Sequence, residues 1–300
     1  MTVKNSEAKT PAASIWIEGI DDGLKWDVRQ GRQPLTEVQD MATNSKLVVV
    51  TGGASGIGEA TARRFAAEGA TVVIGDLNTE RGKIVVAELC ELGQKAVFYP
   101  LDLGSDESIQ LFAENVLKTH GIPAALVNSG GILQNAVRLL DMNVAEFDRL
   151  FDINVRGTLM VSRAFGAPMC DAGRGAIINL CSLTTFRASA QIGYAVGKAG
   201  LKMLTEVMAA EWGPKGVRVN AVAPGYTLTP AMQARIDTGE RDPDAVVQKS
   251  ALRRFVRPDE VADTIFFLCS EGASAITGIT LPIDCGWLVT TAYSSYAAQP

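Results

Sequence analysis

The sequence predicts an α/β fold: a single doubly wound, Rossmann-type parallel sheet with helices on both faces. Short apolar runs rich in β-branched residues alternate with amphipathic helical segments from Lys46 onward, which is typical of repeated strand–helix units. A glycine-rich turn joins the first apolar run to the first helical segment. The 300 residues are 47% hydrophobic, enough for a full core, and no linker-like stretch interrupts the alternation. We therefore expect one domain from residue 46 to the end.

The first run, KLVVVT, is apolar and β-branched, as expected for a strand buried on both faces of a parallel sheet. Further strands are expected at residues 71–75, 96–99, 124–128, 176–181 and 217–221. In the first helical segment, 56–68, Ile57, Ala62 and Phe65 lie on one apolar side. The other expected helices are 81–92, 108–120, a long helix near 144–168, and 192–212.

The two ends of the chain differ from this pattern. Residues 1–45 are polar and turn-rich, yet they contain two of the four tryptophans, Trp16 and Trp26. We expect an N-terminal arm that docks on the body or on a neighbouring subunit, with a loosely held extension as the alternative. After Trp287, Tyr293 and Tyr296 make the tail unusually aromatic, which favours contact with a neighbour's surface.

Composition excludes several classes of protein. Lys and Arg number 28 against 33 Asp and Glu, a net charge of −5, which argues against binding to nucleic acid or an anionic membrane. Five scattered cysteines favour reduced thiols in the cytoplasm. His120 is the single histidine, which excludes a serine triad elsewhere and zinc sites with two histidines, so no metal is expected. No apolar run approaches the roughly 18 residues of a membrane span.

The glycine-rich turn, Thr51 to Gly58, lies where a helix begins. Glycines there let the backbone turn tightly and let a pyrophosphate reach the N–H groups of the helix, although a plain tight turn is the alternative. Asp76 follows the second strand, 18 residues after Gly58, and an acid there accepts hydrogen bonds from ribose hydroxyls and repels a 2′-phosphate. With Ser55 in the turn and Leu77 after the acid, no basic residue is present, which favours NAD over NADP.

Tyr194 and Lys198 are four residues apart, so they share one face of a helix. A neighbouring ammonium favours the phenolate, and lowering the tyrosine pKa from about 10 to about 7 takes about 4 kcal/mol of differential stabilisation. We expect Lys198 and the positive ring of an oxidised nicotinamide cofactor to supply it together. Such a pair is common by chance, but it becomes informative downstream of a glycine turn.

Taken together, these motifs resemble the short-chain dehydrogenase/reductase family, in the branch with a TGxxxGxG turn and a YxxxK active site. The resemblance extends from about Leu47 to Trp287 in the family's order. Three positions depart from it: Ser129 and Gly130, within the segment that matches the family's NNAG, and Cys285, where a second glycine is usual. The cofactor-binding residues that it implies, besides the Tyr194–Lys198 pair, are Gly52, Ser55, Gly56, Ile57, Gly58, Asp76, Leu77, Asp102, Leu103, Asn128, Gly130, Pro224, Gly225, Thr227 and Thr229.

The resemblance implies a catalytic set of Asn154, Ser182, Tyr194 and Lys198 and a reversible hydride transfer. Tyr194 would be the general acid or base, Ser182 would hydrogen-bond the substrate oxygen, and Lys198 would depress the tyrosine pKa and bind the nicotinamide ribose. Asn154 would hold a water that relays protons. Ser182 lies twelve residues before Tyr194, one fewer than the family spacing, so Cys181 competes for the role; the strand register favours Ser182.

The activity expected is an NAD-dependent dehydrogenase acting on a secondary alcohol, a polyol or the matching ketone. Two alternatives remain: a 3-oxoacyl-thioester reductase, which usually prefers NADP, and a nucleotide-sensing protein without turnover. Residues 228–252 are expected to form a lid. In the family that the sequence resembles, small and apolar helix faces such as those of 144–168 and 192–212 pair between subunits, which implies a tetramer or a dimer; packing in the core alone is the alternative. The cluster of Arg253, Arg254 and Arg257 either meets an acidic partner or forms a salt-bridged face.

Overall fold

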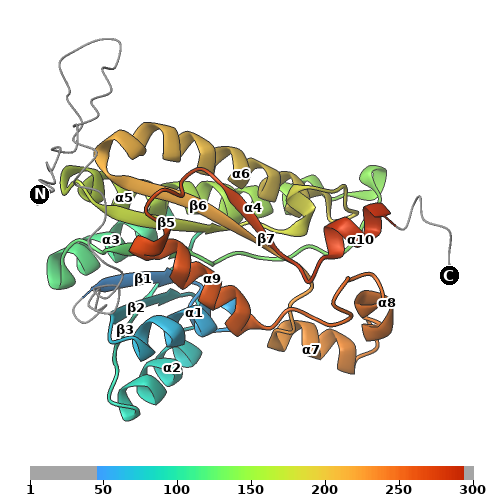
Figure 1. Cartoon of the computed structure of the whole chain (residues 1–300), viewed down its shortest axis with the longest axis horizontal. Helices are drawn as coiled ribbons and strands as arrows, with labels where there is room; N and C mark the ends of the chain where they lie inside the picture. The colour runs from blue at the N-terminus through green and yellow to red at the C-terminus, as the bar shows by residue number, and fades with distance from the viewer. Residues whose placement is uncertain (1–45, 294–300) are drawn as a thin grey trace, which may run out of the picture. The chain divides into compact units, whose positions relative to one another are not determined.

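The structure, a computed structural model, describes residues 46–293. Figure 1 shows a parallel sheet between two layers of helices. Its strands lie in the order β3-β2-β1-β4-β5-β6-β7, all parallel, as the doubly wound prediction requires. The strands are β1 (Leu47–Thr51), β2 (Thr71–Asp76), β3 (Lys95–Pro100), β4 (Ala125–Asn128), β5 (Gly175–Leu180), β6 (Val217–Pro224) and β7 (Thr280–Ile283).

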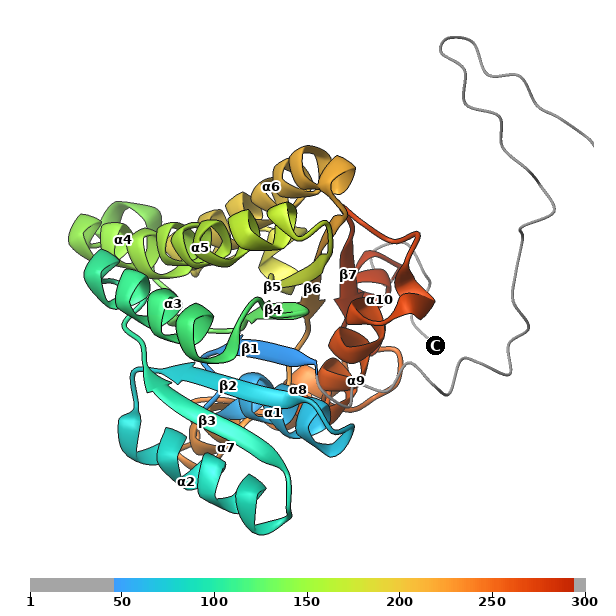
Figure 2. The ribbon, with the colours of Figure 1, turned by 90° about the vertical axis from the view of Figure 1, so that its left-hand side faces the viewer.

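The helices divide between the two faces of the sheet, as Figure 2 shows. One face carries α1 (Gly56–Ala67), α2 (Thr79–Glu91) and α9 (Pro258–Cys269). The other carries α3 (Asp106–His120), α4 (Val144–Phe151), α5 (Thr158–Asp171) and α6 (Ile192–Trp212). The short helices α7 (Pro230–Asp237) and α8 (Pro243–Val247) follow β6, and α10 (Trp287–Tyr293) follows β7.

Strand β1 shows how the sequence builds two cores around one sheet. Val48 and Val50 belong to the apolar cluster beneath α1 and α9, whereas Leu47 and Val49 belong to the cluster beneath α3 and α5. Successive side chains of a strand point to opposite faces, so a strand covered on both sides must be apolar at every position. This is why the unbroken run of apolar residues forms a central strand.

The long helix expected near 144–168 is interrupted. A π-helical turn, Asp152–Gly157, separates α4 from α5. Single π turns within helices are rare and occur frequently at functional sites. The pattern of apolar residues did not reveal this turn, because one extra residue per turn barely alters the spacing of the apolar positions.

The C-terminal half contains helices and strands that the sequence analysis did not predict. Strand β6 extends three residues beyond its predicted end to Pro224, and β7 adds an edge strand. The predicted lid contains α7 and α8 rather than a simple loop. The predicted arm, residues 1–45, and Tyr296 of the tail lie outside the described residues, so both remain predictions.

Candidate active site

A cleft of about 840 Å³ opens where the carboxyl ends of the central strands meet the first turn of α1. This is the place where ligands bind in open parallel sheets. Predicted cofactor residues that line it are Gly52, Ser55, Gly56, Ile57, Gly58, Asp76, Leu77, Asp102, Leu103, Gly130 and Thr229. The cleft is also lined by residues that the sequence did not single out, among them Ile132, Arg149, Asp152, Ile153, Leu180 and Ala231. These come from loops and helix faces that only the fold brings to the cleft.

The glycine turn is closely packed against the loop that follows β4. Gly52 has a φ of +65°, and a Cβ on it would lie 2.6 Å from the Gly130 Cα. A Cβ on Gly58 would lie 2.1 Å from the Gly52 carbonyl oxygen. Both positions therefore require glycine. The turn leads into α1 at Ser55, whose side chain makes no capping hydrogen bond.

The first turn of α1 is consequently suited to an anion. The first N–H groups of a helix have no acceptor within it, and at α1 no side chain of the N-cap replaces one. These donors, together with the helix dipole, favour a phosphate group. The cleft, the glycine turn and this uncapped helix end fit a dinucleotide.

Asp76 is held rigidly at the end of β2. Its carboxylate accepts hydrogen bonds from the N–H of Ala54, at 3.0 Å, and from the N–H of Asn78, at 2.9 Å. It thus joins the glycine turn to the loop after β2. The neighbouring Leu77 is 72% exposed and lines the cleft, so no basic side chain follows the acid there.

Some predicted cofactor residues lie behind the cleft rather than on its lining. The buried Asn128 side chain donates to Ser162 Oγ and to Asn179 Oδ1, both at 2.9 Å, and so links β4 to β5 and α5. At the end of β6, Pro224 and Gly225 lead to Thr227, whose hydroxyl donates to the Gly225 carbonyl at 3.1 Å. The Asn128 side chain therefore supports the carboxyl end of β4 and does not line the cleft.

Tyr194 and Lys198 both lie on α6, as the four-residue spacing predicted. The Lys198 Nζ is 5.4 Å from the centre of the Tyr194 ring and donates to the Leu180 carbonyl at 2.5 Å. Because Leu180 also lines the cleft, this bond connects the pair to it.

The pKa values of the pair differ from the expectation. Burial raises the pKa of Tyr194 to about 12, although a hydrogen bond with Ser182 acts in the opposite direction. Burial also lowers the pKa of Lys198 to about 8. In the chain without cofactor, desolvation thus outweighs the depression of the tyrosine pKa that we expected from the neighbouring ammonium.

Ser182 and Cys181 both lie near the tyrosine, but they differ in their surroundings. Ser182 lies close enough to Tyr194 to lower the pKa of the phenol, and it begins a short 3₁₀ turn, where its hydroxyl accepts from the Thr184 N–H at 3.3 Å. Cys181 is buried, and its thiol donates to the Lys198 carbonyl at 3.6 Å. The shortened spacing is absorbed in the loop before α6.

Asn154 lies in the π turn between α4 and α5 and is buried. Its side chain accepts from the Ile132 N–H at 2.8 Å and donates to the Ile132 carbonyl at 2.9 Å. It therefore fixes the chain after β4, where Ile132 lines the cleft. The π turn leaves the helix irregular at the residue that the resemblance implies for a water relay.

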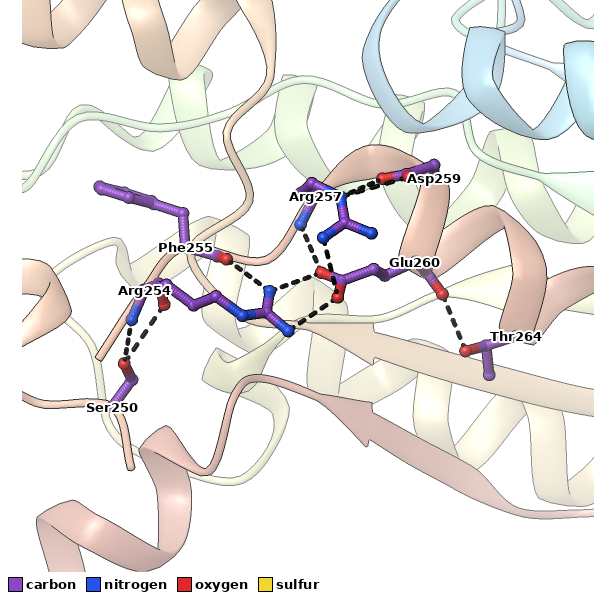
Figure 3. Close-up of polar contacts among 7 residues, drawn as sticks. All are labelled: Ser250, Arg254, Phe255, Arg257, Asp259, Glu260 and Thr264. Atoms are coloured by element: carbon purple, nitrogen blue, oxygen red, sulfur yellow. Dashed lines mark hydrogen bonds and ion pairs between the residues drawn. The ribbon is translucent and has the colours of Figure 1, made fainter. Parts of the chain in front are cut away.

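The arginine cluster forms a salt-bridged surface (Figure 3). Arg254 donates to both carboxylate oxygens of Glu260 at 2.8 Å, and these hydrogen bonds lower the pKa of Glu260 to about 2. Arg257 pairs with Asp259 at 3.0 Å and lies 3.5 Å from Glu260. Acids of the same chain thus neutralise these two arginines, the second of the two alternatives.

Two further features of residues 46–293 bear on function. No helix in this range is long and apolar enough to cross a membrane. Across the same range, no group of three or more His, Cys, Asp or Glu side chains gathers as metal ligands would. His120, at the end of α3, hydrogen-bonds with the Tyr99 hydroxyl at 3.0 Å, far in sequence from the pair on α6.

Comparison with known proteins places this site in context. A family model described as "Enoyl-(Acyl carrier protein) reductase" matches residues 52–288. A 3-oxoacyl-[acyl-carrier-protein] reductase from Thermotoga maritima is 34% identical over 83% of this chain and all of its own length. A D-threitol dehydrogenase from Mycolicibacterium smegmatis is 35% identical over 86% of this chain and 98% of its own. The crystal structure of an NAD⁺-bound xylitol dehydrogenase superposes with a TM-score of 0.77 and 28% identity, covering 81% of this chain and 99% of that one.

Proposed function

Because this chain belongs to the short-chain dehydrogenase/reductase family of oxidoreductases, we propose that it is an NAD-dependent dehydrogenase. Its substrate would be a secondary alcohol or polyol, or the matching ketone in the reverse direction. One observation carries the proposal: Lys198, which lies 5.4 Å from the Tyr194 ring, donates to the carbonyl of Leu180, and Leu180 lines the cleft that the glycine turn opens. When bound, the nicotinamide ring supplies the hydride acceptor or donor.

Each side chain of the set has a role that follows from its position. In alcohol oxidation, Tyr194 would accept the hydroxyl proton of the substrate, and in ketone reduction it would donate that proton. The Ser182 hydroxyl, which already acts to lower the pKa of the phenol, would donate to the substrate oxygen and stabilise negative charge there. Lys198 would hold positive charge beneath the phenol.

The partly buried phenol needs strong electrostatic support to act as a base near neutral pH. A pKa of about 12 must fall by about 5 units, which corresponds to about 7 kcal/mol. Positive charge at Lys198 and at the oxidised ring would supply it in a site closed to water. The chain should therefore hold its phenol neutral until the cleft is filled.

The choice of NAD over NADP rests on Asp76. Its carboxylate is fixed by two backbone N–H groups, so it cannot easily turn away from a 2′-phosphate. Neither Ser55 in the turn nor Leu77 after the acid supplies a compensating cation, and the arginine that lines the cleft, Arg149, comes from α4. The same features argue against the second candidate, a 3-oxoacyl-thioester reductase, which the Thermotoga maritima relative favours. The set around Tyr194 argues against a protein that only senses nucleotides.

We propose a cytoplasmic homotetramer as the working form. All five cysteines are free, as in reducing compartments. On α6, Met203 is 58% and Val207 45% exposed, and on α4, Val144 is 66% exposed. Apolar side chains gathered on two neighbouring helices favour burial between subunits. Sedimentation equilibrium would test the assembly.

The activity itself is tested with a panel of alcohols, polyols and ketones, following NADH absorbance with NAD and with NADP. Tyr194→Phe should bind NADH as the unaltered protein does and lose nearly all turnover. Retained turnover would show that the phenol is not the acid or base. A panel that gives turnover only with NADP would overturn the cofactor assignment.

A further inference from the structure

The helix that carries Tyr194 lacks an N-terminal cap of its own. Gln191 occupies the N-cap position of α6, and its side chain makes no capping hydrogen bond. Tyr194 is the third residue of the helix, so its N–H has no acceptor within the helix. The acceptor comes from elsewhere: the Gln134 Oε1 receives this N–H at 3.2 Å, from sixty residues away.

Gln134 is itself held firmly against the start of α6. It is 1% exposed, and its backbone carbonyl accepts a hydrogen bond from the Gln191 side chain. Nearby, the Val137 N–H donates to the Ala190 carbonyl at 2.9 Å. Together with the bond from the Tyr194 N–H, these contacts join the segment after β4 to the start of α6 at three points. A shift of one would move the other.

We propose that Gln134 is a positioning residue for the Tyr194 phenol: a neutral amide that caps α6 from outside and so fixes the tyrosine relative to the cleft. The same segment passes Ile132, which lines the cleft and is bound by Asn154. The amide therefore ties the tyrosine to one wall of the cleft. This inference rests on the proposed role of Tyr194 as acid or base.

The choice of an amide is informative, because its NH2 group has no partner. The Gln134 Nε2 is buried without an acceptor among the described residues, which is costly in a folded protein. A glutamate would cap the helix, suit its dipole and remove this unpaired donor. It would also bring a negative charge to the backbone of Tyr194 itself, at the first turn of α6, and so oppose ionisation of the phenol. A neutral acceptor caps the helix without that charge.

Few other charged groups near Tyr194 would mask the effect of a carboxylate at position 134. The titratable groups against Tyr194 are Lys198 on α6 and Cys181 at the end of β5. From α4, the apolar Phe147 and Leu150 meet the first turn of α6. Near Gln134, Arg235 of α7 donates to Asn135 at 3.0 Å and is the cation that would partly offset a new carboxylate.

Two substitutions separate the cap from the charge. Gln134→Met removes the acceptor with little change of volume, and Gln134→Glu keeps an acceptor but adds charge. Asn143→Ala is the matched control, because Asn143 caps α4 by accepting the Ala145 N–H at 2.9 Å, and its loss removes one cap from a helix without the tyrosine. Each variant is measured for thermal stability, NADH affinity, and kcat and KM across pH.

We expect Gln134→Met to lower kcat by about tenfold while KM and NADH affinity stay within about twofold, since the phenol is misplaced but the cleft remains. Gln134→Glu should keep its thermal stability and raise the apparent pKa of the base by about one unit. Asn143→Ala should lose stability as Gln134→Met does, with kcat and pH profile unchanged. An unaltered kcat in Gln134→Met, or an unaltered pH profile in Gln134→Glu, would overturn the proposal.

A second readout does not depend on turnover. The phenolate absorption of each protein with NAD bound, minus that of the same protein carrying Tyr194→Phe, reports the titration of Tyr194 alone. Gln134→Glu should move this titration to higher pH, and an unmoved titration would refute the positioning role. Turnover retained in Tyr194→Phe would instead refute the proposed function, so the two failures are distinguishable. Gln134→Glu keeps the test available should Gln134→Met not fold.

Discussion

Replacing Lys198 with methionine should make the protein more stable at neutral pH while abolishing turnover. Lys198 is 6% exposed, and its pKa falls from 10.5 to about 8 because burial disfavours the ammonium. At 1.36 kcal/mol per unit, that fall corresponds to about 3 kcal/mol of destabilisation whenever the lysine must be charged on folding. Methionine removes this cost, but it leaves the Leu180 carbonyl without its hydrogen bond, a loss of about 1 kcal/mol. The net expectation is about 2 kcal/mol of added stability at pH 7.

The pH dependence gives the sharper test. Below pH 8 both folded and unfolded states hold the proton, so the cost of the buried ammonium is constant. Between pH 8 and 10.5 the unfolded chain binds more protons than the folded one, so stability rises with pH. The advantage of Lys198→Met over the unaltered protein should therefore shrink by about 1.4 kcal/mol per pH unit from pH 8 upward. Taking the difference between the two proteins cancels the titrating groups that do not interact with Lys198.

The assay is urea unfolding of the cofactor-free protein at fixed concentration, at intervals from pH 7 to 10. Lys202→Met is the matched control: Lys202 lies one turn further along α6, is partly exposed and pairs with Glu206. Its removal should change the free energy of unfolding by no more than about 0.5 kcal/mol at any pH, as for exposed ion pairs. A Lys198→Met protein that is less stable at pH 7, or whose advantage does not change with pH, would refute the reasoning.

Three further predictions concern the cleft. Asp76→Asn keeps the shape of the side chain but removes its charge, and should raise kcat/KM with NADP relative to NAD by about tenfold or more; an unchanged ratio would count against contact with the ribose. Gly130→Ala restores the residue usual in the family, but its Cβ would lie 2.6 Å from the Leu103 Cδ1 and press that side chain into the cleft, so NADH affinity measured by fluorescence should fall several-fold. Ser182→Ala should lower kcat by about 100-fold and Cys181→Ala by much less. The reverse order would show that Cys181, and not Ser182, acts on the substrate oxygen.

The fold was predictable because its signals are local. Buried parallel strands must be apolar at every position and surface helices at every third or fourth, and both patterns are readable along the chain. Strand β7 was not predicted, because it has four residues, contains Pro282 and lies at the sheet edge, where proline is tolerated. Helix α7 of the lid was not predicted either, because it has no fully buried residue to mark its inner face.

The site was predictable to the extent that backbone geometry demands a residue type. Gly52 and Gly58 have no room for a side chain, so their spacing can be recognised without coordinates. Ser182 could not be separated from Cys181 by spacing, because a loop absorbs one residue without a trace in the pattern. Gln134 carried no signal, since its partner lies sixty residues away and shares no motif with it.

By itself, the amino-acid order determined the alternating layers, the glycine-rich turn at the start of α1 and the placement of a phenol and an amine on one helical face. All of these follow from short-range rules: side-chain period, backbone freedom and spacing along a helix. Only the tertiary structure decided which amide caps the helix that carries the phenol and how strongly burial raises the pKa of that phenol. Those properties depend on desolvation and on contacts between distant segments, and neither is written in any short stretch of the chain.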